Sequence, residues 1–250
     1  MKNCFKNLQK IEFVLTYACT GSCKHCSQGE HTQDGICLDS NAATDCIKSL
    51  TKNYDLNTAL VFGGEPLLFS DQVCKIIACA RDCKIPKRQV ITNGYFTKDK
   101  EKMRDVARKL FECGVNDLLL SADAFHQQTI PLEAVVQFAT ELKGAGVPTR
   151  IQPAWLVDKC DSNPYNEKTR KIVDTLCALG FYESDGNVVF CEGNAKKYLA
   201  EFFTGKLPQN PYVDDPDDIR CISVNPVGDT IFGNICCDDI LKIMENYKNR

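Results

Sequence analysis

The chain has 250 residues, 44% of them hydrophobic and 25% charged, which is the composition of an ordinary globular protein. Because 30 Lys and Arg face 33 Asp and Glu, the net charge is −3, and no basic excess exists for general nucleic-acid binding. No apolar run approaches the roughly 18 residues that cross a membrane, and the first ten residues lack the apolar segment of a signal peptide. We therefore expect a cytoplasmic protein with neither a nucleic-acid nor a membrane partner.

Cysteine is the unusual feature of the composition, with 16 residues in the chain. Disulfide scaffolds that depend on so many cysteines are short, secreted chains, and this chain is long and has no export signal. Reduced thiols in such a protein point to metal binding or redox chemistry, and their spacing decides between uses.

Six short, mostly unbroken apolar runs predict strands that are covered on both faces. In chain order they are residues 11–16, 58–62, 89–92, 117–121, 149–156 and 187–190. The intervening segments have helical periodicity over 39–50, 70–83, 98–113, 132–144 and 166–179. Repeated strand–helix units imply a parallel sheet with right-handed crossovers. The expected fold class is α/β, either an incomplete barrel or a doubly wound sheet.

The alternating pattern ends near Thr204, which predicts two parts for the chain. Residues 1–204 form the α/β core, and residues 205–250 form a linker with a short C-terminal extension. Prolines and acidic residues make 205–220 a surface connection. The final segment has a turn at 224–229 and a helix at 239–247, whose apolar stripe should pack on the core. The stripe consists of Ile240, Leu241, Ile243 and Met244.

Three cysteines follow the first strand directly. Cys19, Cys23 and Cys26 have the spacing C-x3-C-x2-C, so three thiols lie within eight residues. Such short intervals let one loop surround one compact iron–sulfur cluster. Three protein ligands leave one metal position open, which is typical of catalytic rather than structural metal sites. The alternative is zinc, which needs a fourth ligand, and His25 and His31 are the nearby candidates.

Polar or glycine-rich motifs also follow the next three strands. The first is Gly63-Gly64-Glu65-Pro66, in which the glycines permit close backbone approach and the carboxylate could meet an ammonium group. Such residues at the carboxyl ends of parallel strands are where α/β barrels place their active sites. Singly, each motif is also explained by an ordinary turn or a helix cap, and their order along the chain favours a site. The later two motifs are Thr92-Asn93-Gly94 and Ser121-Ala122-Asp123.

These motifs and their order resemble the radical S-adenosylmethionine (SAM) superfamily over roughly residues 11–200. The resemblance implies a partial (βα)6 TIM-like barrel and a 4Fe–4S cluster held by Cys19, Cys23 and Cys26, with SAM on the fourth iron. It implies that one-electron reduction cleaves SAM to methionine and a 5′-deoxyadenosyl radical, which abstracts hydrogen from a substrate. An external reductant such as flavodoxin or ferredoxin would be a partner.

The resemblance also implies a set of SAM contacts. Gly63, Gly64 and Glu65 match the motif that holds the methionine amine, and His25 matches a position whose backbone lies beside the adenine. The remaining implied contacts, to the ribose or the carboxylate of SAM, are Asn93, Ser121, Asp123 and Gln152. His126, close behind these in the chain, is interpreted as a surface or helix-start histidine.

The C-terminal extension resembles a shortened form of the extension in peptide- and protein-modifying members, which binds auxiliary clusters. A covering role is favoured over an auxiliary cluster here, because few cysteines are present. The candidates for auxiliary ligands are Cys191, Cys221, Cys236 and Cys237, with Cys160 as a further possibility.

The expected function is abstraction of hydrogen from a peptide or small-molecule substrate, and three alternatives stay open. Glycyl-radical-enzyme activating enzymes have a similar size and cysteine loop, but they typically carry Asp-x-Lys where this chain has Ser121-Ala122-Asp123. A non-catalytic iron–sulfur electron carrier would not need Gly63-Gly64-Glu65. A further alternative is a binding module whose fold is stabilised by zinc.

Overall fold

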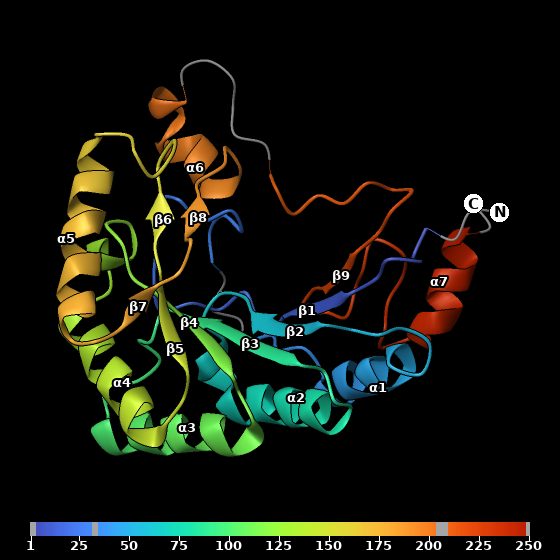
Figure 1. Cartoon of the computed structure of the whole chain (residues 1–250). Coiled ribbons are helices and arrows are strands. Elements are labelled where there is room, and N and C mark those ends of the chain that lie inside the picture. Colours follow the sequence, from blue (N-terminus) through green and yellow to red (C-terminus); the bar gives the residue numbers. More distant parts are fainter. Residues whose placement is uncertain (1–3, 32–34, 204–209, 249–250) are drawn as a thin grey trace.

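The computed structural model describes residues 4–31, 35–203 and 210–248. Its centre is a seven-stranded sheet in the order β7-β5-β4-β3-β2-β1-β9, and every neighbouring pair is parallel (Figure 1). The strands are β1 (Lys10–Val14), β2 (Thr58–Phe62), β3 (Lys87–Thr92), β4 (Asp117–Ser121), β5 (Thr149–Gln152), β7 (Tyr182–Glu183) and β9 (Cys221–Val224). The predicted α/β class with a partial barrel is confirmed.

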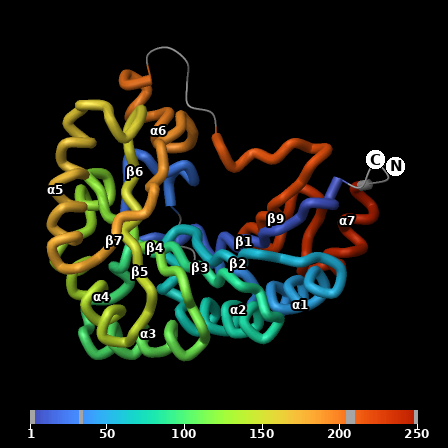
Figure 2. The backbone as a smooth tube through the Cα atoms, in the orientation of Figure 1, coloured from blue at the N-terminus to red at the C-terminus, as the bar shows by residue number. Residues whose placement is uncertain are grey.

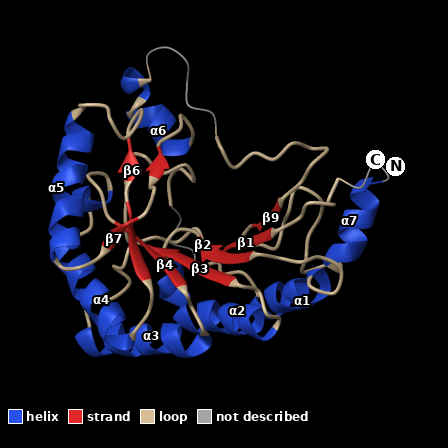
Figure 3. Cartoon of the chain, in the orientation of Figure 1, coloured by secondary structure: helices blue, strands red, loops and turns tan. Residues whose placement is uncertain are grey.

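Helices cover the outer face of the curved sheet, and the strands lie inside them (Figure 3). They are α1 (Ser40–Leu50), α2 (Ser70–Asp82), α3 (Lys100–Cys113), α4 (Leu132–Ala145) and α5 (Pro164–Ala178). Strand β1 shows how the two faces differ. Ile11 and Phe13 are fully buried in the core beneath the helices, whereas Lys10, Glu12 and Val14 face a cavity inside the sheet. This alternation follows from the two-residue period of a strand.

Local signals set the helix boundaries close to those expected from the sequence. The side chains of Asp39, Asp99 and Asn163 accept hydrogen bonds from backbone N–H groups in the first turns of α1, α3 and α5. Helix α3 ends at Gly114, whose φ of 95° lies in the left-handed region that glycine adopts without strain. None of the helices in the described ranges is long and apolar enough to span a membrane.

The structure divides the predicted strand 149–156. Strand β5 ends at Gln152, and after Pro153 the chain continues as β6 (Ala154–Trp155), which pairs with β8 (Asn187–Val188) in a separate two-stranded sheet. Proline has no N–H to donate, so it interrupts a ladder. The sixth barrel strand is therefore β7, paired with β5, and not the predicted strand 187–190.

The C-terminal part of the chain belongs to the sheet. From Asn210 to Arg220 the chain passes from the α6 side of the molecule to the opposite sheet edge, where β9 pairs with β1 (Figure 2). Helix α7 (Ile240–Lys248) contacts α1, and Ile240, Ile243 and Met244 are buried in the main core, as predicted. The predicted domain boundary at 204/205 lies outside the described residues. The remaining short helices are η1 (Pro66–Phe69), η2 (His126–Gln128), α6 (Gly193–Tyr198) and η3 (Ala200–Phe202).

Candidate active site

A cavity of ≈ 680 Å³ occupies the inner face of the sheet. Its volume is within the roughly 300–1,000 Å³ that small-molecule and cofactor sites have. The loop after β1, which contains the three closely spaced cysteines and which we call the cysteine loop (residues 15–31), lines its carboxyl-end mouth. All of the residues that the sequence assigned to SAM, except Glu65, also line it: His25, Gly63, Gly64, Asn93, Ser121, Asp123 and Gln152.

Cys19, Cys23 and Cys26 all face the cavity, the first two buried and the third half-buried. The Cys19 sulfur accepts hydrogen bonds from the Gly21 N–H at 3.3 Å and from the Asn93 side-chain amide at 3.6 Å. Burial raises the pKa of the Cys19 thiol to about 12 and also raises the pKa of Cys26. A coordinating cation would deprotonate such thiols outright. Three sulfur donors on one short loop fit an iron–sulfur cluster.

Gly63 and Gly64 bring the end of β2 against the backbone of the cysteine loop. The Gly64 N–H donates to the Thr16 carbonyl at 2.7 Å, and the Glu65 N–H donates to the Ala18 carbonyl at 2.8 Å. A Cβ on Gly64 would lie 2.1 Å from the Ala18 oxygen, and one on Gly63 would lie 2.6 Å from the Thr16 oxygen. The glycines thus permit close contact with the cysteine loop itself, in addition to lining the cavity.

Glu65 is fully buried, and its carboxylate joins the ends of two strands. Oε1 accepts from the Leu67 N–H and the Thr92 hydroxyl, and Oε2 accepts from the Asn93 N–H, at 2.7–2.9 Å. Burial is the main reason that its pKa is raised, to about 7, although these three donors act in the opposite direction. Since a carboxylate has about four acceptor positions, these three donors leave one unused, on a side chain that is buried behind the cavity wall.

Asp123 and His126 form a pair beside the cysteine loop. Oδ2 of Asp123 lies 2.8 Å from Nδ1 of His126 and accepts from the Ala154 N–H, while Oδ1 accepts from the N–H groups of Phe125 and His126. Burial raises the pKa of Asp123, but the charge and hydrogen bond of His126 outweigh it and hold that pKa below its usual value. Because four protein donors use the carboxylate, Asp123 orients His126 rather than offering free acceptors.

The His25 ring packs against the rings of Phe125 and His126. Its ring centroid is 4.8 Å from those of both Phe125 and His126, and its Nδ1 is buried without a hydrogen-bond partner among the described residues. Burial, with a smaller contribution from the His126 charge, lowers its pKa to about 4, against the opposing effect of Asp123. His25 is therefore a neutral imidazole at physiological pH.

Helix α6 supports the cysteine loop from the opposite side. The Asn194 N–H donates to the Cys26 carbonyl at 2.9 Å, and its side-chain amide donates to the Cys23 carbonyl at 3.1 Å. On β5, Gln152 accepts a hydrogen bond from the Ser184 hydroxyl. The cysteine loop is thus held by backbone contacts from both β2 and α6, which restrain it before any ligand binds.

One group of three or more His, Cys, Asp or Glu residues within the described ranges has ligand atoms compact enough for a single metal ion. It consists of Cys23, His25 and His126, whose ligand atoms lie within 4.8 Å of one another. The three cysteine sulfurs are not such a group. A single zinc ion on Cys19, Cys23 and Cys26 therefore suits the structure less well than a larger cluster, which separates its sulfur ligands.

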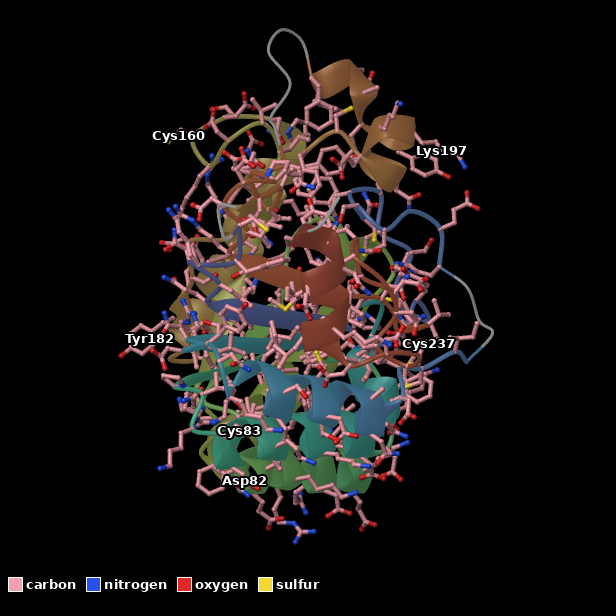
Figure 4. The ribbon with its side chains drawn as sticks, turned by 90° about the vertical axis from the view of Figure 1, so that its right-hand side faces the viewer. Asp82, Cys83, Cys160, Tyr182, Lys197 and Cys237 are labelled. Atoms are coloured by element: carbon pink, nitrogen blue, oxygen red, sulfur yellow. The ribbon has the colours of Figure 1, made fainter. Side chains whose placement is uncertain are left out.

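The proposed auxiliary cysteines are not brought together. Cys221 begins β9 at the amino end of the strands, beside Lys10, while Cys236 and Cys237 lie exposed after the turn that follows β9. Cys160 and Cys237 lie far apart on the molecule (Figure 4). None of these cysteines, nor Cys191, belongs to a compact metal-binding group in the described part of the chain.

Sequence reasoning missed His126 and the polar end of the cavity. His126 begins η2, as expected of a helix-start histidine, but with a side-chain exposure of 16% and a buried partner it is not a surface histidine. At the amino ends of the strands, Lys10 and Glu12 form an ion pair of 2.6 Å that lines the cavity. The signal for this pair is present in β1, where charged residues alternate with Ile11 and Phe13.

Comparison with known proteins identifies the family. A model of the radical SAM superfamily matches residues 13–190. The chain belongs to the radical SAM superfamily. Its members are enzymes that use a 4Fe–4S cluster and SAM. The resemblance inferred from the cysteine, glycine and Thr-Asn-Gly motifs is thereby confirmed.

Individual relatives are distant. A probable GTP 3′,8-cyclase of Methanocaldococcus jannaschii is 25% identical over 129 residues, which cover 51% of this chain and 41% of that protein. A second probable GTP 3′,8-cyclase, from Saccharolobus islandicus, is 26% identical over 49% of this chain and 37% of its own length. The matched segment thus spans less than half of these curated relatives.

Solved structures share the fold over nearly the whole chain. Streptococcus suis SuiB bound to S-adenosylmethionine superposes with a TM-score of 0.60 at 13% identity, covering 95% of this chain and 65% of SuiB. The anSMEcpe protein with bound AdoMet and a Kp18Cys peptide gives a TM-score of 0.58 at 14% identity, covering 96% and 82%. At these identities the likeness concerns the fold.

Proposed function

We propose that Cys19, Cys23 and Cys26 hold the 4Fe–4S cluster and that the cavity beneath them binds SAM and a substrate. The main support for this proposal is that three thiols from one restrained loop lie at the carboxyl-end mouth of a ≈ 680 Å³ cavity. When bound there and reduced by an external donor such as flavodoxin or ferredoxin, the cluster would supply the electron for cleavage of SAM to a 5′-deoxyadenosyl radical, which would abstract hydrogen from the substrate.

The chain's own residues divide into those that hold the cysteine loop and those that line the cavity for SAM. Gly63, Gly64 and Asn194 hold the loop through backbone contacts. Asn93 donates to the Cys19 sulfur, which lowers the electron density on that ligand. Glu65 fixes the β2 and β3 ends from behind the cavity wall. The proposed lining contacts of SAM are His25, Gly63, Gly64, Ser121 and Gln152. Asp123 also lines the cavity, where it orients His126.

The substrate is proposed to be a peptide or a polar small molecule. Away from the cysteine loop, the cavity is lined by the Lys10–Glu12 ion pair and by Gln89. Charged and amide groups in a cavity favour a substrate with hydrogen-bonding groups, because an apolar substrate would remove these groups from water without replacing their hydrogen bonds to it. The curated relatives named as GTP cyclases and the peptide-bound fold relative both have polar partners in their names.

Iron loading of single variants tests the assignment of the cluster. Replacing Cys19, Cys23 or Cys26 by Ala should remove the broad visible absorbance and most of the about four irons per chain after anaerobic reconstitution. Cys177→Ala is the matched control, because Cys177 is an exposed thiol on α5. A triple Ala variant that still carries about four irons would show that the cluster lies elsewhere.

A further inference from the structure

The compact group Cys23, His25 and His126 is a set of side chains that the proposed function uses only in part. Its ligand atoms lie within 4.8 Å of one another. Ligand atoms around a tetrahedral zinc ion are roughly 3.3–3.8 Å apart, given bonds of about 2.0–2.3 Å. Small side-chain rotations would therefore close this group around one ion.

The hydrogen bonds around the group leave nitrogen lone pairs available for a metal. Asp123 engages Nδ1 of His126 at 2.8 Å, so a neutral His126 keeps its lone pair on Nε2. A carboxylate behind a histidine is the usual support of a metal-ligating imidazole. Nδ1 of His25 is buried and has no hydrogen-bond partner among the described residues, although buried polar atoms nearly always have one.

We propose that, before the iron–sulfur cluster is assembled, the chain binds one zinc ion through Cys23, His25 and His126. One thiolate and two imidazoles are ligands that zinc prefers, and three protein ligands leave a fourth position for water. These zinc ligands differ from the three cysteines proposed for the cluster. Cys23 and His25 belong to the cysteine loop, and His126 belongs to η2.

The zinc ion and the cluster exclude each other, because both require Cys23. Zinc bound to the cluster-free chain would keep the Cys23 thiolate from iron until the metal is removed. The proposal shares Cys23 and His25 with the proposed function but not Cys26 or His126, and variants of these two residues separate the proposals. Cys26→Ala removes a cluster ligand and leaves the zinc set complete, whereas His126→Ala removes a zinc ligand and leaves all three cluster cysteines.

Zinc-edge X-ray absorption of the cluster-free 250-residue chain with one equivalent of zinc measures the ligand set directly. One sulfur and two imidazole nitrogens are expected. Two or more sulfurs would overturn the proposal, since they would place zinc on the cysteine loop thiols. This measurement uses the unaltered chain, so it does not depend on the folding of any variant.

Zinc affinity in variants provides the second test, by competition with a chromophoric chelator. Cys23→Ala and His126→Ala should each weaken zinc binding more than about tenfold. Even the loss of a residue that only hydrogen-bonds to a metal ligand typically weakens metal binding by about tenfold or more. Cys26→Ala and His31→Ala should leave it within about twofold. His31 is a matched histidine, because it lies 3.5 Å from the Cys26 sulfur but outside the compact group. An equal loss in Cys26→Ala, or none in His126→Ala, would contradict the proposal.

Discussion

Gly64 shows at the scale of a single residue how the cysteine loop is positioned. A methyl group there would lie 2.1 Å from the Ala18 oxygen, a separation that real Cβ atoms do not show. We expect Gly64→Ala to displace the cysteine loop and to lower both the iron content after reconstitution and the midpoint of thermal unfolding. The sequence assigned this glycine to ligand approach, which would have predicted full iron content with weaker SAM binding.

The matched control for this variant is Gly144→Ala. Gly144 lies within α4, and a Cβ there would meet no atom within 4 Å. Alanine favours a helix interior over glycine by roughly 0.5–1 kcal/mol, so the control should be unchanged or slightly stabilised. Full iron content in Gly64→Ala, equal to that of the control, would show that the contact with Ala18 is dispensable.

Asp117 carries a prediction about pH. Its carboxylate accepts hydrogen bonds from Arg150 and Gln89 at 2.7–2.9 Å and lies 3.0 Å from the Lys87 ammonium. Burial raises the pKa of Asp117, but the hydrogen bonds and charges of Arg150 and Lys87 outweigh burial and hold it below its usual value. Stability from this group is therefore present above pH about 4 and is lost as pH falls through the lowered pKa.

We expect Asp117→Asn to reduce the free energy of unfolding by about 2 kcal/mol at pH 7, the scale of hydrogen bonds to a charged group. The difference from the unaltered chain should shrink below pH 4, where the native carboxyl also becomes protonated. Urea unfolding at pH 7 and at the lowest pH that keeps both proteins folded measures it. A difference that is independent of pH would contradict the assigned role of the charge.

Which residues line the cavity was largely predictable, but their contacts were not. Three motifs at strand ends placed Cys19, Gly64 and Asn93 around one cavity, because parallel strands end at the same edge of a sheet. The position of His126 at a helix start was expected, but its burial was not, because that burial depends on segments that only the folded chain brings together. The same reason hid the use of the Asp123 carboxylate by four protein donors.

At the scale of an element, helix α7 depends on its buried face. Ile243 is 4% exposed in the main core, whereas Ile231, in the preceding turn region, is 82% exposed. We expect Ile243→Ala to lower the free energy of unfolding by about 2–4 kcal/mol. Ile231→Ala should change it by less than about 0.5 kcal/mol. Chemical denaturation of both variants measures this, and similar values for the two would show that α7 is not packed as described.

Long elements with caps were predictable, and very short strands were not. The helices began and ended within a few residues of the expected positions, because Asp39, Asp99 and Gly114 provide local signals. Strands β6, β7 and β8 have two residues each, which is too short for a periodic pattern. Strand β9 joins the sheet through a partner more than 200 residues away in the chain, so no local signal could reveal its pairing.

At the scale of the whole molecule, residues 221–248 are part of the folded core. Strand β9 pairs with β1 over four residues, and Ile222, Val224 and Ile235 are buried with the α7 side chains. Truncation after Arg220 would expose this apolar surface and the edge of β1. We expect an aggregated or unfolded product, measured by size-exclusion chromatography and circular dichroism. A monomeric, folded truncation that still cleaves SAM would instead support the separate covering role expected from the sequence.

In the proposed function, the cysteine loop and the cavity beneath it together cleave SAM reductively. The most direct measurement is the amount of 5′-deoxyadenosine formed when the anaerobically reconstituted chain is reduced in the presence of SAM. We predict its formation in the unaltered chain and in Cys177→Ala, and its loss in Cys19→Ala, Cys23→Ala and Cys26→Ala. A chain that carries about four irons and is reduced, but forms no 5′-deoxyadenosine, would contradict the proposed function. It would favour a non-catalytic electron carrier.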